Sequence, residues 1–266
     1  KSILLKNISP FSNYKLRYIS PDITKVLKLG GYDHVLVYGY NSPTSLMALR
    51  YCRQHRIPIS LRCEGESVQK ISKLKALARK LFLTYMFRQF DGFTAICKAN
   101  YDHYLQYGVP DSKISFVTQT VNDSFFSSAA PASYDYLRSK YNLKQELIFI
   151  YGSKLRKEKN PLDAIKAFCN LPEEVDAKLI VLSDGPEKRV CEQWKVDNDT
   201  LNRIIFTGYV DFQEMRDLFN LADVLLMTSS ETIGATLYQA LFARLAIVTS
   251  DMVPGWFDVV IPGENG

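Results

Sequence analysis

The stretch from Asp223 to Gln239 constrains the fold of this chain more than any other. Val224–Met227 is a short apolar run between polar residues, which is typical of a buried strand in a parallel sheet. Residues 235–243 have the composition of a helix, with apolar side chains on more than one side, and the polar loop 228–234 lies between the two. This order predicts a strand, a loop and a helix of an α/β fold.

The loop also predicts an anion site. If it brings the backbone N–H groups of Ile233, Gly234 and Ala235 to the start of a helix, unpaired donors face a ligand at the positive end of the helix dipole. Gly234 would let a phosphate come close to the backbone. Glu231 would accept hydrogen bonds from sugar hydroxyls, and Gln239 would lie near the other end of the same ligand. The pattern indicates a nucleotide-sugar; a plain polar loop between a buried strand and a helix is the alternative.

Residues 222–240 resemble the donor-site signature of the family-4 retaining glycosyltransferases of the GT-B fold. That signature reads E-x-x-G-x-x-x-x-E-A after an A-D-V-x-x-x-x-S strand, and Glu231, Gly234 and Ala240 match it. The chain differs at Gln239, where the family usually has a second Glu that accepts from the ribose hydroxyls. Gln keeps one acceptor oxygen but loses the charge.

A second loop carries cations that suit a diphosphate. Leu147–Tyr151 is expected to open a second α/β domain, and a loop rich in Lys and Arg follows it before the next helix. The family's counterpart reads G-R-L-x-x-x-K, and its Arg and Lys clamp the diphosphate of the donor. Lys154 and Lys159 match these two positions, although Lys154 lacks the bidentate fork of Arg. A solvated run of charges is the alternative.

Two further segments of the C-terminal half resemble known motifs. Residues 208–210 resemble the turn at which the family's backbone contacts the nucleotide base, so Tyr209 and Val210 are expected at the donor. Asp197-Asn198-Asp199 imitates a D-x-D metal motif, but it follows a helix rather than a strand. A solvated connector is therefore expected there, with no metal site. No cofactor is expected either, because the nucleotide-diphosphate sugar is a substrate.

The N-terminal half predicts a parallel sheet of its own. The strand-like runs 34–38 and 57–62 lie on either side of a predicted helix, 44–55, and this order forms a βαβ unit. Arg62 and Glu66 follow at the carboxyl end of the second strand, where an open α/β sheet binds its ligands. We expect both to contact the sugar or the acceptor; a helix cap beside solvated acids is the alternative.

Residues 68–90 predict a long basic helix with one apolar stripe. Two interpretations stay open. The stripe faces the core and the cations are solvated, or the stripe lies against anionic lipid headgroups as a peripheral membrane contact. The stripe consists of Leu74, Leu77, Leu81 and Tyr85.

Charge and cysteine content narrow the classes of function. Residues 1–145 carry 21 Lys and Arg against 9 Asp and Glu, whereas residues 146–266 carry 12 against 19, which suggests two domains with different partners. No aromatic and basic motif of a known module supports nucleic-acid binding, which ranks last. Five scattered cysteines without a C-x-x-C pair indicate reduced thiols in a cytoplasmic protein. No signal peptide is expected, and no apolar segment approaches the roughly 18 residues that a membrane span requires.

The clearest shift in composition is the small, Pro-containing run at residues 127–133. The chain starts at Lys1 rather than Met, and its last residues resemble a mid-domain motif of the family, so both domains are expected to be incomplete. The predicted fold class is α/β with two Rossmann-like domains, as in GT-B. Its expected parts are an N-terminal acceptor domain at 1–126, a linker at 127–145 and a C-terminal nucleotide-sugar donor domain at 146–266.

The resemblance implies a retaining, metal-independent, hexosyltransferase-type glycosyltransferase. It would move a sugar from a UDP- or GDP-sugar to a hydroxyl of a glycan or lipid-linked acceptor in surface polysaccharide assembly, in the cytoplasm or at the inner face of the membrane. Lys154, Lys159 and the amides of residues 233–235 would stabilise the leaving diphosphate, which takes the proton of the acceptor, and Glu231 would orient the sugar. Gln239 motivates the alternative, a catalytically silent nucleotide-sugar-binding or scaffolding protein of the same fold.

Overall fold

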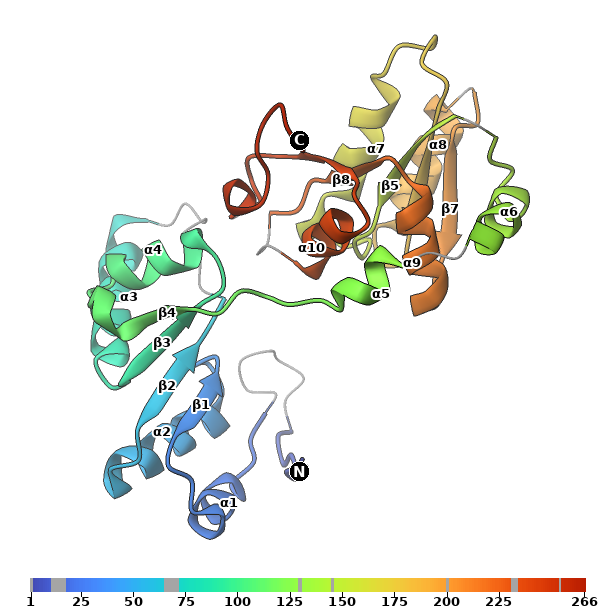
Figure 1. Cartoon of the computed structure of the whole chain (residues 1–266). Helices are drawn as coiled ribbons and strands as arrows, with labels where there is room; N and C mark the ends of the chain where they lie inside the picture. The colour runs from blue at the N-terminus through green and yellow to red at the C-terminus, as the bar shows by residue number, and fades with distance from the viewer. Residues whose placement is uncertain are drawn as a thin grey trace. The chain divides into compact units, whose positions relative to one another are not determined.

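The computed structural model describes residues 2–10, 18–64, 72–128, 131–144, 146–199, 201–230, 234–253 and 255–266. Contacts divide the chain into two compact units, Lys1–Thr118 and Gln119–Gly266 (Figure 1). Each unit contains one parallel sheet with helical connections. The predicted α/β class is therefore confirmed.

The first unit holds a four-stranded sheet in the order β1-β2-β3-β4, and every neighbouring pair is parallel. Because parallel neighbours require a crossover, a helix lies between each of the first three strands and the next. The strands are β1 (Val35–Tyr38), β2 (Ile59–Arg62), β3 (Gly92–Ala95) and β4 (Ile114–Phe116). The helices are α1 (Ile23–Gly30), α2 (Pro43–His55), α3 (Lys73–Phe87), α4 (Lys98–Gln106) and the short 3-10 helix η1 (Asp111–Lys113).

Local sequence explains where α2 begins and ends. The Ser42 hydroxyl accepts a hydrogen bond from the Ser45 amide at 3.0 Å, and Pro43 occupies the first helical turn, where its missing N–H costs nothing. The helix ends at Arg56, whose left-handed backbone (φ 57°) turns the chain toward β2. The βαβ unit predicted from the sequence is formed by β1, α2 and β2.

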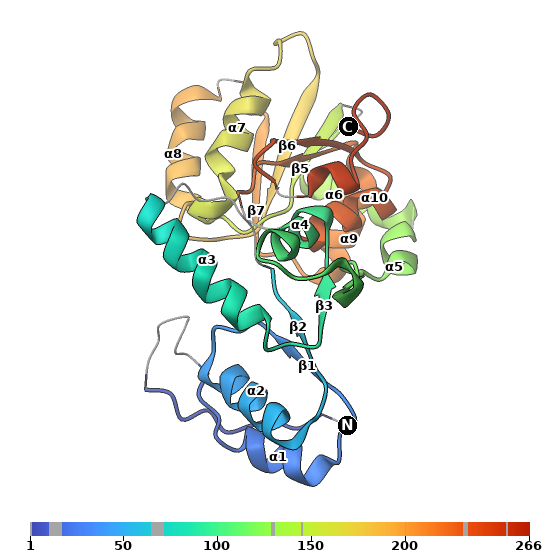
Figure 2. The same cartoon turned by 90° about the vertical axis from the view of Figure 1, so that its left-hand side faces the viewer.

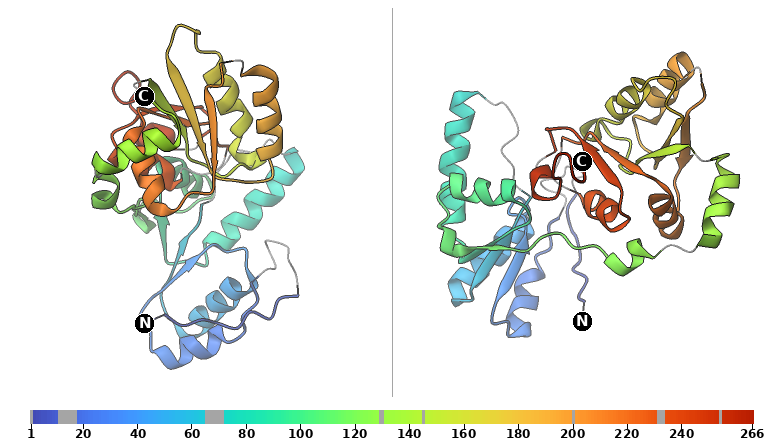
Figure 3. Two further views of the ribbon diagram at one scale, coloured as in Figure 1. Left: turned by 90° about the vertical axis from the view of Figure 1, so that its right-hand side faces the viewer. Right: turned by 45° about the horizontal axis from the view of Figure 1, so that its top comes forward.

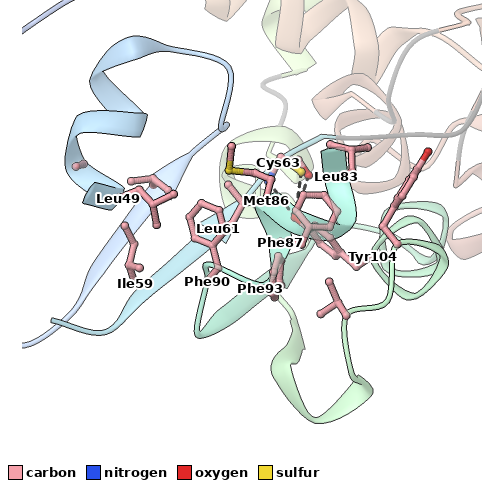
Figure 4. Close-up of a cluster of buried hydrophobic side chains, with 14 of the residues drawn as sticks. Leu49, Ile59, Leu61, Cys63, Leu83, Met86, Phe87, Phe90, Phe93 and Tyr104 are labelled. Atoms are coloured by element: carbon pink, nitrogen blue, oxygen red, sulfur yellow. Dashed lines mark hydrogen bonds between the residues drawn. The ribbon is translucent and has the colours of Figure 1, made fainter. Parts of the chain in front are cut away.

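The core of the first unit is a cluster of buried hydrophobic side chains that includes several aromatic rings (Figure 4). Phe87 of α3 contacts Phe93 of β3 and Tyr104 of α4 edge-on, with ring centroids 5.5 and 5.6 Å apart. Ile59 and Leu61 of β2 are fully buried in the same cluster. Such contacts fix α3 and α4 against the sheet.

Helix α3 buries a different face from the one that the sequence suggested. Leu83, Met86 and Phe87 are buried, whereas the four residues of the predicted stripe are 55% to 78% exposed. The core-facing interpretation is therefore wrong for this stripe. The predicted stripe does lie on one face of α3. The contacts with the core, however, come from Leu83, Met86 and Phe87 near the carboxyl end of the helix.

The second unit holds a five-stranded parallel sheet in the order β7-β6-β5-β8-β9. The strand order reverses at β5, so the gap between β5 and β8 is a topological switch point. The strands are β5 (Leu147–Tyr151), β6 (Ala177–Leu182), β7 (Ile204–Gly208), β8 (Val224–Met227) and β9 (Ala246–Thr249). The helices are α7 (Pro161–Cys169), α8 (Lys188–Asn198), α9 (Phe212–Leu221) and α10 (Ala235–Phe242), with the 3-10 helices η2 (Lys157–Lys159) and η3 (Trp256–Asp258).

Burial in the second unit matches the apolar runs of the sequence. β8 occupies the predicted range, and its Leu225, Leu226 and Met227 are buried. Helices α7 and α8 lie side by side (Figure 2) and pack against β5 and β6 through Phe168 and Cys191. These two helices thereby cover the buried side chains on one face of β5 and β6.

The segment before β5 packs on the second unit. Its two helices, α5 (Asp123–Ser127) and α6 (Pro131–Lys140), lie beside α9 (Figure 3). Phe126 is 1% exposed, contacts Phe212 of α9 edge-on, and accepts a 2.7 Å hydrogen bond on its carbonyl from the Asn220 side chain. The boundary between the two units therefore lies before α5, between Thr118 and Gln119. The sequence predicts a linker at 127–145. Composition marked the small residues but carried no information on these aromatic contacts.

Candidate active site

The candidate site lies at the carboxyl ends of β5 and β8, on the two sides of the switch point. Phe149 and Ile150 of β5 pair with Val224 and Leu225 of β8. The loops that leave these two strands therefore start side by side, where open α/β sheets bind their ligands. The first of these loops carries both predicted lysines, and the second leads into α10.

The two loops are joined by hydrogen bonds between residues 158–160 and residues 228–230, which we term the clasp. The Thr228 hydroxyl donates to the Asn160 carbonyl at 2.8 Å, and the Asn160 side-chain amide donates to the Thr228 carbonyl at 3.0 Å. The Ser230 amide donates to the Glu158 carbonyl at 2.9 Å. Three consecutive residues of one loop thus contact three residues of the other, so the loops form one substructure.

Lys159 has a defined place in the clasp. Its ammonium group lies 3.2 Å from the hydroxyl of Ser229, which is buried, and its carbonyl accepts a 2.9 Å hydrogen bond from Tyr151 at the end of β5. Burial raises the pKa of the Tyr151 hydroxyl, so this group stays a donor. Lys154 is exposed on the same loop. The structure fixes the backbone of Lys159 from both strands.

The loop that carries Lys154 is also held by the turn after β6. Leu155 is buried, its amide donates to the Asp184 carbonyl at 3.2 Å, and its carbonyl accepts from the Glu187 amide at 2.9 Å. A Cβ atom at Gly185 would lie 2.3 Å from the Leu155 carbonyl oxygen, so only glycine fits. The cation-bearing loop is therefore packed between the turns after β6 and β8.

The start of α10 lies beyond the clasp along the same chain segment. Gly234 has φ −91° and ψ 168°, which any residue adopts, and the nearest heavy atom to an added Cβ would be the Thr236 nitrogen at 4.0 Å, among the described residues other than its chain neighbours. Neither backbone nor packing thus requires glycine here. Ala235 begins α10 as predicted, and no side chain in the described part of the chain caps the helix. Its first amides are available to an anion.

Several predicted site residues are placed elsewhere or fall outside the described residues. Gln239 is half-buried in α10, more than one turn beyond its start. Tyr209, which is 87% exposed, and the half-buried Val210 follow β7, which is separated from β5 by β6. Arg62 ends β2 of the first unit, and its carbonyl accepts from the Gly39 amide at 2.7 Å. Glu66, Glu231 and Ile233 lie outside the residues that the structure describes.

The acidic triplet that imitates a metal motif has a structural role at one position. The Asp199 carboxylate accepts from the amides of Arg203 and Ile204, at 2.9 and 2.8 Å, and so fixes the start of β7. Within the described ranges, no group of three His, Cys, Asp or Glu side chains lies close enough to hold a metal ion. None of the helices that the structure describes is both long and apolar enough to cross a membrane.

A buried histidine lies in α4 of the first unit. His103 is 1% exposed and packs edge-on against the rings of Phe87 and Tyr107. Burial, assisted by the positive charge of Arg79, lowers the pKa of His103 to about 4. Neither ring nitrogen has a hydrogen-bond partner among the described residues. The imidazole is therefore neutral near pH 7, and no motif in the sequence singles it out.

The clasp residues Asn160, Thr228 and Ser229, and Tyr151 beside them, were not predicted from the sequence. Their hydrogen bonds join positions 68 to 70 residues apart, apart from the contact of Tyr151 with Lys159. Their position at or just after the ends of two strands of a parallel sheet indicates a ligand-binding region. It does not indicate which of these residues form hydrogen bonds with one another.

A protein-family model described as "Glycosyl transferases group 1" matches residues 134–266. N-acetyl-alpha-D-glucosaminyl L-malate synthase of Bacillus anthracis is 30% identical over 132 residues, which is 49% of this chain and 34% of that protein. Alpha-monoglucosyldiacylglycerol synthase of Acholeplasma laidlawii is 29% identical over 164 residues, 59% of this chain and 40% of that protein. The chain thus spans less than half the length of these two curated relatives.

A solved structure shares the fold at low sequence identity. HepE of Anabaena, crystallised with UDP and glucose, has a TM-score of 0.73 and 18% identity, and the match covers 93% of this chain and 67% of that one. This likeness confirms the predicted architecture of two Rossmann-like domains.

Proposed function

The chain belongs to the group 1 glycosyl transferases, with a GT-B fold, and from this premise we propose that it forms part of a retaining, metal-independent glycosyltransferase. The reaction is the transfer of a sugar from a nucleotide-diphosphate sugar to an acceptor hydroxyl. The observation that carries the proposal is the clasp, which holds Lys159 of the loop after β5 against the loop that leads to the start of α10. A cation and a helix N-terminus at one switch point suit a diphosphate.

In the proposed reaction, protein charge stabilises the leaving nucleotide. Lys159, Lys154 and the amides at the start of α10, including those of Ile233, Gly234 and Ala235, stabilise the negative charge that develops on the diphosphate. Glu231 orients the donor sugar, and the leaving phosphate accepts the proton of the acceptor hydroxyl. Gln239, Tyr209 and Val210 contact the nucleoside. Each role is a proposal for these residues.

A UDP-sugar is the proposed donor, with a GDP-sugar as the other candidate. The complex of Anabaena HepE with UDP and glucose supports uridine. The proposed acceptor is a hydroxyl of a glycan or a lipid-linked glycan in surface polysaccharide assembly, and Arg62 and Glu66 are proposed to contact it. The name of the Acholeplasma relative, a glucosyldiacylglycerol synthase, supports an acceptor of lipid character.

We further propose a peripheral contact of α3 with the inner face of the membrane. Successive helical residues are rotated by about 100°, so Leu74, Leu81 and Tyr85 lie opposite the buried Leu83 and Phe87. Lysines and arginines occupy the borders between the two faces, and α3 contains no Asp or Glu. The first unit carries 18 Lys and Arg against 7 Asp and Glu. An exposed apolar stripe with cations on both sides suits anionic lipid.

Calorimetric titration of UDP and GDP, and of their sugar conjugates, tests the donor site. Lys159→Ala is expected to weaken UDP binding about 10- to 100-fold, because a charge-assisted contact is lost. Lys157→Ala is the matched control, since it removes the same charge from the same 3-10 helix at an exposed position. Equal losses in both variants would indicate general attraction rather than a site. Absence of nucleotide binding would refute the donor proposal.

Turnover separates an enzyme from a silent relative of the same fold. UDP release from UDP-sugars, with and without acceptor, is measured for the wild type and for Gln239→Glu, which restores the residue usual in the family. Donor binding without release of UDP in either protein would favour the silent alternative. Release by Gln239→Glu alone would identify Gln239 as the cause of the silence.

A further inference from the structure

Two backbone carbonyls next to the proposed diphosphate site receive hydrogen bonds from side chains of different strands. Tyr151 of β5 donates to the carbonyl of Lys159 at 2.9 Å. The Thr228 hydroxyl, directly after β8, lies 2.8 Å from the Asn160 carbonyl and 3.2 Å from that of Lys159. The peptide group that follows Lys159 is therefore held between the ends of the two strands at the switch point.

Asn160 completes the arrangement from the other side. It adopts a left-handed conformation (φ 46°, ψ 51°) that few residues other than glycine accept and that asparagine tolerates. This conformation lets η2 end at Lys159 and α7 begin at Pro161, with Asn160 as the single residue between them. The Asn160 side-chain amide donates to the Thr228 carbonyl at 3.0 Å. Asn160 and Thr228 thus make a reciprocal pair, each donating from its side chain to the other's backbone.

This pair couples the charge of Lys159 to the segment that leads into α10. Ser229, whose hydroxyl lies 3.2 Å from the Lys159 ammonium, is the next residue after Thr228. Ser230 then donates to the Glu158 carbonyl through both its amide and its hydroxyl, at 2.9 and 3.1 Å. A shift of Lys159 relative to β8 would have to break several of these hydrogen bonds together. The position of the lysine relative to the segment after β8 is therefore fixed.

We infer that Thr228 and Asn160 are positioning residues for the proposed donor reaction: their reciprocal hydrogen bonds hold Lys159 where it meets the diphosphate. This inference rests on the proposed function of Lys159. It assigns no direct contact with the nucleotide to either residue. Their effect on UDP binding must then act through the lysine.

A double-mutant cycle on the whole chain, with UDP as the probe, tests this inference. Thr228→Val removes the hydroxyl at nearly constant shape and is expected to weaken UDP binding about tenfold. In the Lys159→Ala background, the same substitution is expected to add less than about twofold. Thr228→Ser keeps the donor and should restore binding. Thr249→Val, the same change at the last residue of β9 and outside the clasp, should leave UDP binding unchanged.

Asn160→Gly provides a second route if Thr228→Val does not fold. Glycine accepts the left-handed backbone but lacks the amide donor, so the same dependence on Lys159 is expected. Equal effects of either substitution with and without Lys159 would overturn the inference, because they would indicate a purely structural role. Unchanged UDP binding in both substitutions would also overturn it while leaving the donor site intact. If Lys159→Ala itself had no effect, the proposed function of Lys159 would fail first.

Discussion

Gly185 and Gly234 lie on loops of the second unit, and a methyl group at each would meet very different surroundings. At Gly185, a Cβ atom would approach the Leu155 carbonyl to 2.3 Å, whereas at Gly234 the nearest heavy atom would be 4.0 Å away. Gly185→Ala is expected to destabilise the protein by about 3 kcal/mol. Gly234→Ala is expected to change stability by less than about 0.5 kcal/mol yet weaken UDP binding about tenfold, because the methyl group keeps the phosphate from the amides. Denaturant unfolding and calorimetry measure both; a strongly destabilised Gly234→Ala variant would contradict the argument.

His103 predicts a pH dependence of stability in the first unit. Its pKa is about 4 in the folded chain, against an ordinary value of 6.5, so the unfolded state binds more protons between these values. The stability that the neutral ring provides is present above pH 6.5 and is lost as the pH falls through this window. Between pH 7.5 and pH 5, the wild type is expected to lose about 2 kcal/mol more than His103→Phe. Urea unfolding at the two pH values measures this, and identical losses would contradict a buried neutral ring.

Helix α3 exposes more apolar side chains than a helix that only packs against a core would need to. Its carboxyl end packs into the core through Leu83, Met86 and Phe87, but residues Lys73–Ala78 are exposed or nearly so. A helix with apolar side chains on two opposite faces has two surfaces to cover. Only one is covered by the core of the first unit, and the proposed membrane contact accounts for the other.

Vesicle sedimentation tests the role of α3. The triple variant Leu74→Ser, Leu81→Ser, Tyr85→Ser is expected to bind vesicles that contain phosphatidylglycerol at least about tenfold more weakly than the wild type, since about 25 cal/mol is lost per Å² of apolar burial. Val196→Ser, at an exposed valine of α8, is the matched control and should bind as the wild type does. Binding should also weaken with salt and on phosphatidylcholine alone. Equal binding by the triple variant would refute the contact.

For the whole molecule, the two units have separate buried cores. The first gathers around Phe87 and Phe93, and the second around Phe149 and Phe168. The proposed diphosphate site belongs to the second unit alone. Ligand bound to one unit stabilises only that unit, unless unfolding of the two is coupled.

Differential scanning calorimetry is expected to resolve two unfolding transitions. UDP at about 100 times its Kd stabilises its unit by about 2.7 kcal/mol, which raises one transition by about 5–10 °C and leaves the other in place. Lys159→Ala should abolish the shift at the same UDP concentration. A single transition, or equal shifts of both, would show that the units unfold together.

The strands and the class of fold could be predicted from the sequence because their signals are local. Val224–Met227 is apolar over its whole length and is followed by a helix-forming segment, so its neighbours in the chain suffice to identify a buried strand. The same holds for the βαβ order of the first unit. Glycine, lysine and alanine at the expected spacings also led to the family. These properties depend on residues only a few positions apart.

Only the tertiary structure decided which lysine of the loop after β5 joins the clasp and which face of α3 packs against the core. By sequence, Lys154 and Lys159 both fall on cation positions of one motif, yet the structure places Lys159 in the clasp and leaves Lys154 exposed. Likewise, the apolar stripe of α3 did not reveal which face the core would cover. The partners of residues 158–160 lie 68 to 72 residues away in the chain. Because only the pairing of β5 with β8 brings these residues together, no local pattern could identify them.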